Sequence, residues 1–363
     1  MKKIGIITLT GYINYGNILQ NYALQTFLYK LSKENIATTL WFENTDLKIY
    51  KKFLLKLSYI SNGKGFGNFI NKLIHFSKAV RDYNFKNFHN KYITSIHEKN
   101  IVGLNNKYDY FVAGSDQIWN PYWLKNSTEF LQFADRNKRV AYAASFGVSE
   151  IKSDKIEIVR KGLEGIDYIS VREQAGAKIV KNLTGKDVIV VVDPTLLLLA
   201  DDWEKIMERP AWYDDEKYIL VYFLGNLPDK VSDDIKILSK KYKLKIIDLM
   251  DEKNNYYCSP PSEFLYLIKN CSLMYTDSFH GTVFSILNKK PFVTCSKEGG
   301  MNMDSRIDTL LSMFNLQNRK ISKENNYEIA NPMEIEYPDI EAILNRERQR
   351  SKEFLCKALN IKE

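Results

Sequence analysis

The sequence predicts an α/β protein with parallel sheets and two domains. Short apolar segments typical of buried strands alternate with segments of helical periodicity along the whole chain, and this alternation is the pattern that produces parallel sheets. The chain has 363 residues, which is more than a single domain usually contains. We place the junction close to residue 200, where the apolar segment 188–198 gives way to DDWEKI (201–206).

The first half opens with a strand, a polar turn and a helix. KKIGIITL (2–9) is almost continuously apolar, as expected for a strand covered on both faces. A turn rich in glycine and asparagine follows, and then a helix that buries Leu19 and Phe27. The turn lacks the GxGxxG spacing of a dinucleotide site. Further strands are expected at 38–42, 108–113, 139–147, 168–171 and 188–198.

The second half repeats the alternation of strands and helices. The last long segment, 337–359, has the spacing of an amphipathic helix. Strands are expected at 217–225, 243–250, 272–276 and 291–296, and helices within 227–241, 262–271 and 299–316.

Composition excludes several classes of protein. The four cysteines have no CxxC spacing, so we expect neither a zinc site nor a disulfide framework, and a reducing compartment fits. The start MKKIGIITLT resembles a strand more than a signal peptide, and no apolar run is long enough for a transmembrane helix. These features predict a soluble cytoplasmic protein.

The positive charge is concentrated in one segment. Between Lys48 and Lys91 there are ten Lys or Arg residues and one acid, Asp82, so this stretch alone carries a charge of +9. The formal net charge of the whole chain is +8, so the rest of the chain is close to neutral. The region 48–92 has helical spacing and could face an anionic membrane surface. The alternative is an ordinary solvated helix face. Nucleic acid binding is not expected, because no recognised nucleic-acid motif accompanies the charge.

The stretch MYTDSFHGTVFSI (274–286) carries the most chemistry. Asp277 and Ser278 are both suitable helix N-caps, which places His280 in the first turn, where the helix dipole favours a neutral imidazole. Gly281 would let another group approach the backbone. A neutral base beside exposed N–H groups suits an anionic substrate. The alternative is that His280 only caps the helix or fills a gap.

Polar residues also follow several predicted strands of the first half. Ser115, Asp116 and Gln117 follow one strand and Ser145 follows the next. Arg172 comes after a third, and its guanidinium suits a carboxylate or phosphate. In α/β folds this edge of the sheet is where ligands bind. The alternatives are an Asx-type turn at 115–117 and a surface pair between Arg172 and Glu173.

Seven motifs in order resemble those of the polysaccharide pyruvyl transferase family. The resemblance covers roughly residues 3–316, and no motif in the basic region or the C-terminal helix contributes to it. The motifs are NYGNILQNYALQ (14–25), VAGSDQIWNP (112–121), AYAASFG (141–147), SVREQAG (170–176), VDPTLLL (192–198), TDSFHGTVFSI (276–286) and SRIDTLL (305–311).

The resemblance implies two Rossmann-like domains that face each other across a cleft, in a GT-B-like arrangement. We assign residues 1–200 to the first domain, with the basic helical region as an insertion, and 201–336 to the second. The C-terminal helix, 337–363, could pack back on the first domain. The resemblance also implies transfer of pyruvate from phosphoenolpyruvate onto two hydroxyls of a sugar, which gives a cyclic ketal and phosphate.

The family associates activity with the histidine and arginine that correspond here to His280 and Arg172. We expect them on opposite walls around the donor, with His280 as the base. Asp277 either orients the imidazole or is only the N-cap. No cofactor is expected, and catalysis is expected to be metal-independent. The candidates for contacting substrate are Asn14, Gly16, Asn17, Gln20, Ser115, Asp116, Gln117, Ser145, Ser278, Gly281, Thr282 and Arg306.

The acceptor is left open by the sequence. A sugar on a lipid carrier would give the basic region 48–92 a role at the inner membrane face, with the protein bound peripherally. Two other functions compete with pyruvyl transfer. One is a GT-B glycosyltransferase that uses a nucleotide sugar, and the other is a non-catalytic carbohydrate-binding or assembly protein.

Overall fold

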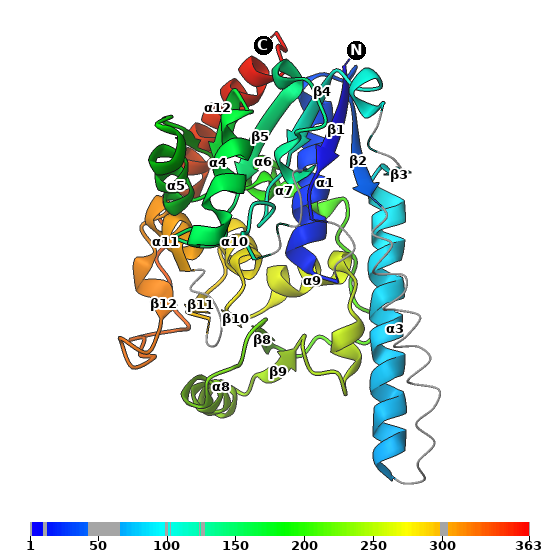
Figure 1. Ribbon diagram of the computed structural model, residues 1–363. Coiled ribbons are helices and arrows are strands. Elements are labelled where there is room, and N and C mark those ends of the chain that lie inside the picture. Colours follow the sequence, from blue (N-terminus) through cyan, green and yellow to red (C-terminus); the bar gives the residue numbers. More distant parts are fainter. Residues whose placement is uncertain are drawn as a thin grey trace.

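The computed structural model contains two parallel sheets, one in each half of the chain (Figure 1). The first sheet has seven strands in the order β3-β2-β1-β4-β5-β6-β7, and the second has five in the order β12-β11-β10-β8-β9. The alternation of strands and helices therefore produced the parallel sheets it predicted. The structure describes residues 2–9, 13–42, 66–98, 101, 103–122, 124, 128–297 and 304–362.

The first half, through residue 204, contains the larger sheet. Its strands are β1 (Lys3–Ile7), β2 (Ile36–Phe42), β3 (Ser95–Glu98), β4 (Tyr110–Ala113), β5 (Arg139–Ala144), β6 (Tyr168–Val171) and β7 (Ile189–Val190). Its helices are α1 (Tyr15–Leu31), α3 (Phe66–Tyr92), α4 (Ile156–Glu164), α5 (Gln174–Thr184), α6 (Pro194–Leu197) and α7 (Ala200–Glu204).

The second half contains the smaller sheet and ends in a long helix. Its strands are β8 (Tyr218–Tyr222), β9 (Lys245–Asp248), β10 (Leu273–Thr276), β11 (Phe292–Cys295) and β12 (Lys320–Ile321). Its helices are α8 (Asp229–Tyr242), α9 (Pro261–Asn270), α10 (Phe279–Leu287), α11 (Asp304–Met313) and α12 (Ile340–Ala358). None of these described helices, nor those of the first half, combines the length and hydropathy needed to cross a membrane.

Three expectations about elements need revision. The segment 188–198 forms only the two-residue β7, because Asp193 accepts a hydrogen bond from the N–H of Thr195 and caps α6, with Pro194 at its first position. Strands β3 and β12 were not predicted. Of the expected basic helix 48–92, α3 accounts for 66–92, and residues 48–65 lie outside the described residues.

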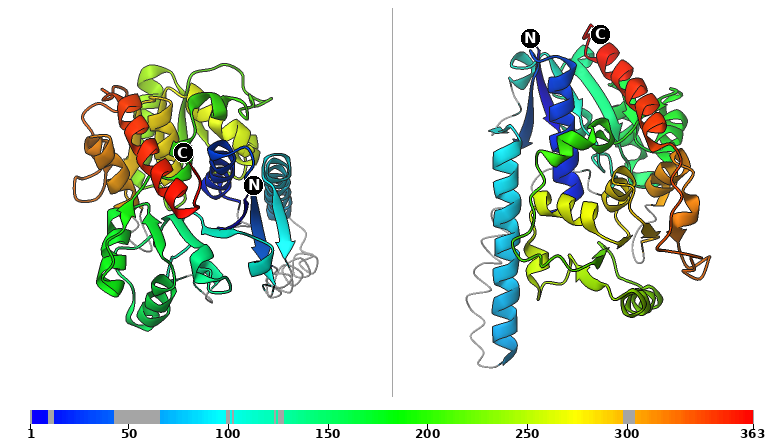
Figure 2. Two further views of the ribbon diagram at one scale, coloured as in Figure 1. Left: turned by 90° about the horizontal axis from the view of Figure 1, so that it is seen from above. Right: turned by 180° about the vertical axis from the view of Figure 1, so that it is seen from behind.

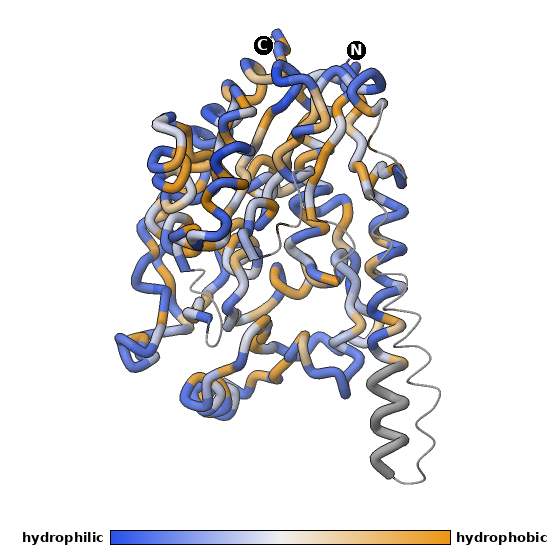
Figure 3. Tube along the Cα trace, in the orientation of Figure 1, coloured by the Kyte–Doolittle hydropathy of each residue, from blue (hydrophilic) through white to orange (hydrophobic). Residues whose placement is uncertain are grey.

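The strand order brings the ends of distant strands to one edge. β1 pairs in parallel with β4, β4 with β5, β5 with β6 and β6 with β7, so their carboxyl ends lie side by side. β10 likewise pairs in parallel with β8 and β11. Figure 3 shows hydrophobic residues concentrated along the strands of both sheets. The polar residues that follow the strands are thereby collected at the edge.

A continuous hydrophobic core joins the two halves. It contains residues of β1 and α1 as well as residues of β8, α9 and α10. Tyr15 at the start of α1 stacks on Phe264 of α9 with ring centroids 4.1 Å apart, and its hydroxyl donates to the carbonyl of Ser259 at 2.7 Å. Trp203 of α7 meets Phe284 of α10 at 4.9 Å. These contacts fix the relative position of the two sheets.

Two long helices, α12 at the C-terminus and the internal α3, pack on the outside of this body. α12 packs against the first half, where the guanidinium of Arg348 donates to the carbonyls of Leu196 and Leu198 at 2.8 Å each. The two termini lie near each other (Figure 2), and Lys2 donates to the carbonyl of Leu359 at 2.7 Å. α3 runs along the side of the molecule past the second half (Figure 1).

Arg81 anchors α3 to the second half. Its buried guanidinium donates to the carbonyl of Tyr257 and to the hydroxyl of Tyr15, and it lies 4.7 to 5.0 Å from the rings of Tyr15, Phe85 and Tyr257. One of the charges in the basic region is therefore used inside the protein.

Replacing Arg81 with Met should lower the free energy of unfolding by roughly 2–4 kcal/mol, because it leaves a buried carbonyl unpaired and removes three cation–π contacts. The matched control is Lys78→Met on the same helix, since Lys78 is half exposed and pairs with Glu252 on the surface. This control should cost less than about 1 kcal/mol. Equal losses in denaturant titrations of the two variants would contradict the anchoring role.

Candidate functional site

A cavity of about 230 Å³ lies where the carboxyl ends of the two sheets meet. Loops after β4 and β10 and the starts of α1, α10 and α11 contribute to its wall. Both halves therefore supply side chains to one space. Of the candidates from the sequence, it is lined by Asn14, Asn17, Asp116, Gln117, Asp277, Ser278, His280 and Arg306.

His280 lies in the first turn of α10, as predicted, because the helix begins at Phe279. Ser278 is the N-cap: its hydroxyl accepts from the N–H of Gly281 at 3.3 Å and its carbonyl accepts from the N–H of Thr282 at 3.0 Å. The first N–H groups of a helix have no partner within it. Those of Phe279 and His280 therefore give the cavity a positive end suited to an anion.

Gly16 of α1 supports the imidazole of His280 from the other half of the chain. A Cβ atom on Gly16 would lie 1.9 Å from Nδ1 of His280, a distance that no side chain could occupy. Gly16 was expected to contact substrate. In the structure, the missing side chain of Gly16 instead leaves room for His280. The imidazole ring therefore packs directly against the backbone of α1.

Asp193, which follows β7 and caps α6, joins His280 to the first half. Its Oδ2 accepts from Arg172 Nη1 at 2.5 Å and from the hydroxyl of Ser115 at 2.9 Å, and it lies 3.6 Å from Nε2 of His280. Its Oδ1 accepts from the hydroxyl of Thr195 at 2.7 Å. Burial opposes ionisation, but His280, Arg172 and the hydrogen bonds together hold the pKa of Asp193 well below its usual range.

Arg172 is buried behind the cavity and does not face it. Besides Asp193, its guanidinium lies 3.4 Å from Asp116, 4.0 Å from Glu173 and 4.3 Å from the ring of Phe279. Burial disfavours its charge, but the three carboxylates raise the pKa of Arg172 above its ordinary value. The expectation that Arg172 and His280 face each other across the substrate is therefore revised, because Asp193 lies between them.

Among the described residues, the cations that face the cavity are Arg306 and Lys297. Arg306 Nη1 approaches Asp116 only to 4.0 Å, and burial, followed by repulsion from Arg172, lowers the pKa of Arg306 to about 10. Its guanidinium thus stays charged at neutral pH. Asp304, also in the wall, is neutralised by Lys320 at 3.0 Å. Lys297 and Arg306 are the groups best placed to hold an anion.

Two buried nitrogens at the cavity have no hydrogen-bond partner among the described residues. They are Nε2 of His280 and Nε of Arg306. Buried polar atoms are nearly always paired in folded proteins, and an unpaired one needs an explanation. A ligand in the cavity that accepts from Nε of Arg306 and bonds to Nε2 of His280 would supply it.

Asp277 has a different role from the two considered in the sequence. Its carboxylate accepts from the N–H groups of Leu224 at 2.6 Å and Gly225 at 2.7 Å, so it holds the loop after β8. Burial raises the pKa of Asp277, although these two hydrogen bonds oppose the effect. Ser278 caps α10, and Asp193 is the carboxylate next to the imidazole.

Several other candidates lie inside the fold instead of at the cavity. Gly281 allows α10 to approach β10, since a Cβ there would lie 2.7 Å from the hydroxyl of Thr276. Thr282 donates to the carbonyl of Ser278 and contacts Thr294. These residues shape the helix start from behind.

Ser115, Ser145 and Gln20 are also fully buried. Ser115 donates to Asp193, and Ser145 accepts from the N–H of Gly147 at 3.1 Å. Gln20 donates to Thr8 and to the carbonyl of Asn17 at 2.9 Å each. Their polar groups stabilise the loops that form the wall.

The loop after β4 is strained at Asp116. This residue has φ of 63°, in the left-handed region that side chains other than glycine rarely adopt. Its carbonyl accepts from the N–H groups of Ser145 and Ile118, which hold the loop in this conformation. Such strain persists where the surrounding structure enforces it, often at functional sites. It directs Asp116 and Gln117 to the cavity.

Asp193, Lys297 and Phe279 were missed as site residues. Asp193 carried a recognisable signal, because an acidic residue directly after an apolar strand and before a proline stands at the sheet edge where ligands bind. Lys297 carried none, since one lysine after a strand resembles any surface lysine.

Replacing Asp193 with Asn should lower the free energy of unfolding by about 3–5 kcal/mol, because Arg172 would remain buried without its main counter-ion. The low pKa of Asp193 also means that its stabilising contribution is present above the unfolded pKa, near 3.9, and is lost as the pH falls below it. The variant should therefore show a flatter acid dependence of stability.

Asp187→Asn is the control, since Asp187 is 86 % exposed in its pair with Lys181 and should contribute less than about 1 kcal/mol. Unfolding titrations at pH 7 and across the acid range provide the measurement. Equal stability of the Asp193 and Asp187 variants would show that the buried pair is not needed.

Comparisons with known proteins agree with this fold. The family model for polysaccharide pyruvyl transferase matches residues 14–297, a span that includes Gly16, Asp193 and His280. The Staphylococcus aureus MnaA–UDP structure is 13% identical, covers 100% of this chain and 98% of its own, and has a TM-score of 0.52. The curated proteins gave no match.

Two further solved structures are similar at lower scores. UDP-GlcNAc 2-epimerase from Neisseria meningitidis bound to UDP-GlcNAc is 11% identical, with coverage of 100% and 95% and a TM-score of 0.46. ADP-heptose LPS heptosyltransferase II from E. coli is 10% identical, with coverage of 99% and 98% and a TM-score of 0.36. The fold is two Rossmann-like domains facing across a cleft in the GT-B arrangement, and the chain belongs to the polysaccharide pyruvyl transferase family.

Proposed function

We propose that this protein transfers pyruvate from phosphoenolpyruvate onto two hydroxyls of a sugar in a polysaccharide or its precursor, forming a cyclic ketal and releasing phosphate. Membership of the family supports pyruvyl transfer. The donor and the ketal chemistry are our proposal. The observation that carries it is the unpaired imidazole nitrogen of His280 and guanidinium nitrogen of Arg306 at one cavity.

The cavity suits a small anionic donor. Its volume of about 230 Å³ is below the roughly 300–1,000 Å³ of sites for drug-sized ligands, which favours an enol phosphate over a complete nucleotide sugar. Arg306, Lys297 and the N–H groups at the start of α10 offer positive charge to the phosphate and carboxylate.

The reaction we propose needs no redox step. A proton adds to the methylene carbon of phosphoenolpyruvate and the oxygen of one sugar hydroxyl bonds to C2. The C2–O bond to phosphate then breaks, and the second hydroxyl bonds to C2 and closes the ring. The two hydroxyl protons balance the proton taken by carbon and the one that leaves with phosphate.

We assign His280 as the base that accepts the proton of an attacking hydroxyl. The carboxylate of Asp193, 3.6 Å from Nε2, would stabilise the imidazolium that forms. Arg172 then acts as a positioning residue, since it fixes Asp193 and does not line the cavity. Gly16 holds the ring from the opposite side.

We also propose that the acceptor is presented on a lipid carrier. The support is the charge of residues 48–92 in the sequence, although Arg81 is buried and does not contribute to a surface.

We propose metal-independent catalysis as well. In the described part of the chain no three His, Cys, Asp or Glu side chains gather as a metal site would require.

The test is incubation with phosphoenolpyruvate labelled with carbon-13 at C2 and with free, nucleotide-linked and lipid-linked saccharides, the last in anionic vesicles. We expect label in a ketal carbon, one phosphate per ketal, the highest rate with the lipid-linked acceptor, and no effect of chelator.

His280→Gln should lower the rate by about 10²–10⁴-fold while the fold is kept. Gly16→Ala should also be severely impaired, because it displaces the imidazole.

Gly165→Ala is the matched control and should keep full activity. A Cβ there would come closer than 3.4 Å only to the end of the flexible Arg139 side chain, and two backbone carbonyls lie at ordinary contact distance. Consumption of a UDP- or GDP-sugar with phosphoenolpyruvate untouched would replace our proposal with a glycosyltransferase. Saccharide binding with no turnover in the wild type would indicate a binding protein. Full activity of His280→Gln would refute the assigned base.

A further inference from the structure

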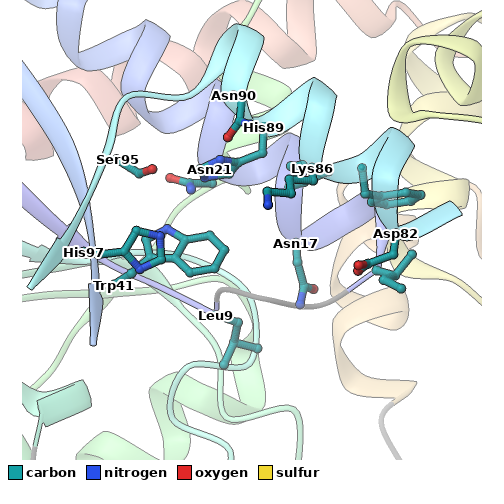
Figure 4. Close-up of a pocket in the computed structure, with 13 residues that line it drawn as sticks. Leu9, Asn17, Asn21, Trp41, Asp82, Lys86, His89, Asn90, Ser95 and His97 are labelled. Atoms are coloured by element: carbon teal, nitrogen blue, oxygen red, sulfur yellow. The ribbon is translucent and has the colours of Figure 1, made fainter. Parts of the chain in front are cut away.

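A second cavity of about 520 Å³ adjoins the first. It lies in the first half, between α1 and α3 on one side and β2 and β3 on the other (Figure 4). The described residues around it include Asn17, Asn21, Trp41, Lys86, His89 and His97. Its volume falls within the range of sites that bind small organic ligands.

The two cavities share a wall at the first turn of α1. Gly16 packs against the imidazole of His280, and the next residue, Asn17, lines both cavities. A ligand in the second cavity would therefore contact Asn17, which separates it from the cavity that contains His280. This places the second cavity next to the reacting centre without making it part of the donor site.

The wall of the second cavity combines an aromatic surface with polar groups. The ring of Trp41 has two histidine neighbours, His89 at 5.0 Å and His97 at 5.2 Å between ring centroids. Figure 4 shows Trp41 and His97 together on one side, with His89, Asn90 and Lys86 of α3 along another. Nε1 of Trp41 and Nε2 of His89 are buried without a partner among the described residues, so each can bond a ligand.

The charge of the second cavity differs from that of the first. Asp82 and Lys86 are the charged residues among those described around it, and their charges cancel. Burial lowers the pKa of His89, a hydrogen bond with Asn90 opposes this effect, and His97 adds a smaller lowering contribution. The net direction favours a neutral imidazole. The wall therefore suits a neutral ligand with many hydroxyl groups better than an anion.

We propose that the second cavity is the acceptor subsite, where a sugar ring stacks its C–H face on Trp41 and its hydroxyls bond Asn17, Asn21 and His89. This inference rests on the proposed function and adds the place and chemical class of the acceptor. The C–H groups of a pyranose carry the partial positive charge that the face of an aromatic ring attracts. Amide and imidazole groups both donate and accept, as hydroxyls require.

A printed array of neutral pyranose mono- to tetrasaccharides tests this directly, without the donor. We expect the wild-type protein to bind at least one glycan, Trp41→Ala to weaken that binding by about tenfold or more, and Trp41→Phe to keep most of it. The matched control, Trp212→Ala, removes a half-buried tryptophan that packs on Tyr256 in the other half and should bind normally.

His97→Ala is a second variant, since this exposed side chain lines the cavity 5.2 Å from the ring of Trp41. Its removal should not disturb the core, and it should weaken glycan binding because it takes away one edge of the aromatic wall. Thermal unfolding of each variant identifies any that fail to fold. Wild-type protein that binds no glycan, or unchanged binding by folded Trp41→Ala or His97→Ala, would overturn the subsite.

The donor reaction separates this inference from the proposed function. Phosphoenolpyruvate in excess should not displace the glycan, and Trp41→Ala should raise the KM for the acceptor while the KM for phosphoenolpyruvate stays unchanged. Ketal formation with an unchanged acceptor KM in that variant would refute the acceptor subsite and leave the proposed function standing. Glycan binding that depends on Trp41, with no ketal formed by the wild type, would refute the proposed function and leave the glycan subsite standing.

Discussion

The buried carboxylate of Asp193 is the interaction on which the site depends. A charge removed from water is tolerated only when it is paired and hydrogen-bonded, and Asp193 meets this condition through Arg172, Ser115 and Thr195. These partners follow β4, β6 and β7, so the order of the strands is what brings them together. The same carboxylate reaches His280 of the second half at 3.6 Å. The imidazole thus lies beside a buried charge of the first half, although 3.6 Å is too long for a hydrogen bond.

This arrangement separates the cations into two roles. The charge of Arg172 is paired with the carboxylates around it, and Arg172 serves to position Asp193. Arg306 and Lys297, in contrast, face the cavity. The first turn of α1 then divides the space, with the cavity at His280 and Arg306 on one side and the aromatic cavity of Trp41 on the other. A pyruvyl donor and a sugar would meet at Asn17 and His280, which is the geometry that the proposed transfer needs.

The sequence predicted those parts of the structure that depend on local patterns. Most of the strands, the helix start at Phe279 and the polar residues after β4 follow from periodicity and capping, and the structure has them, whereas β3, β12 and the short β7 were not foreseen. The contacts of Gly16 and Asp193 with His280 could not be predicted, because they join residues brought together only by packing of the two halves. Arg172 shows the limit most clearly: the residue type suggested an arginine that holds a substrate anion, but the carboxylate it pairs with is Asp193 of the protein.

The most direct test of this account is a double-mutant cycle between Asp193 and His280, measured as kcat/KM for phosphate release from phosphoenolpyruvate. If Asp193 acts through the imidazole, the variant with both Asp193→Asn and His280→Gln should be no slower than His280→Gln alone, because residues that act as a unit are strongly non-additive. Losses that multiply in the double variant would show that the two groups act independently, and would contradict the account.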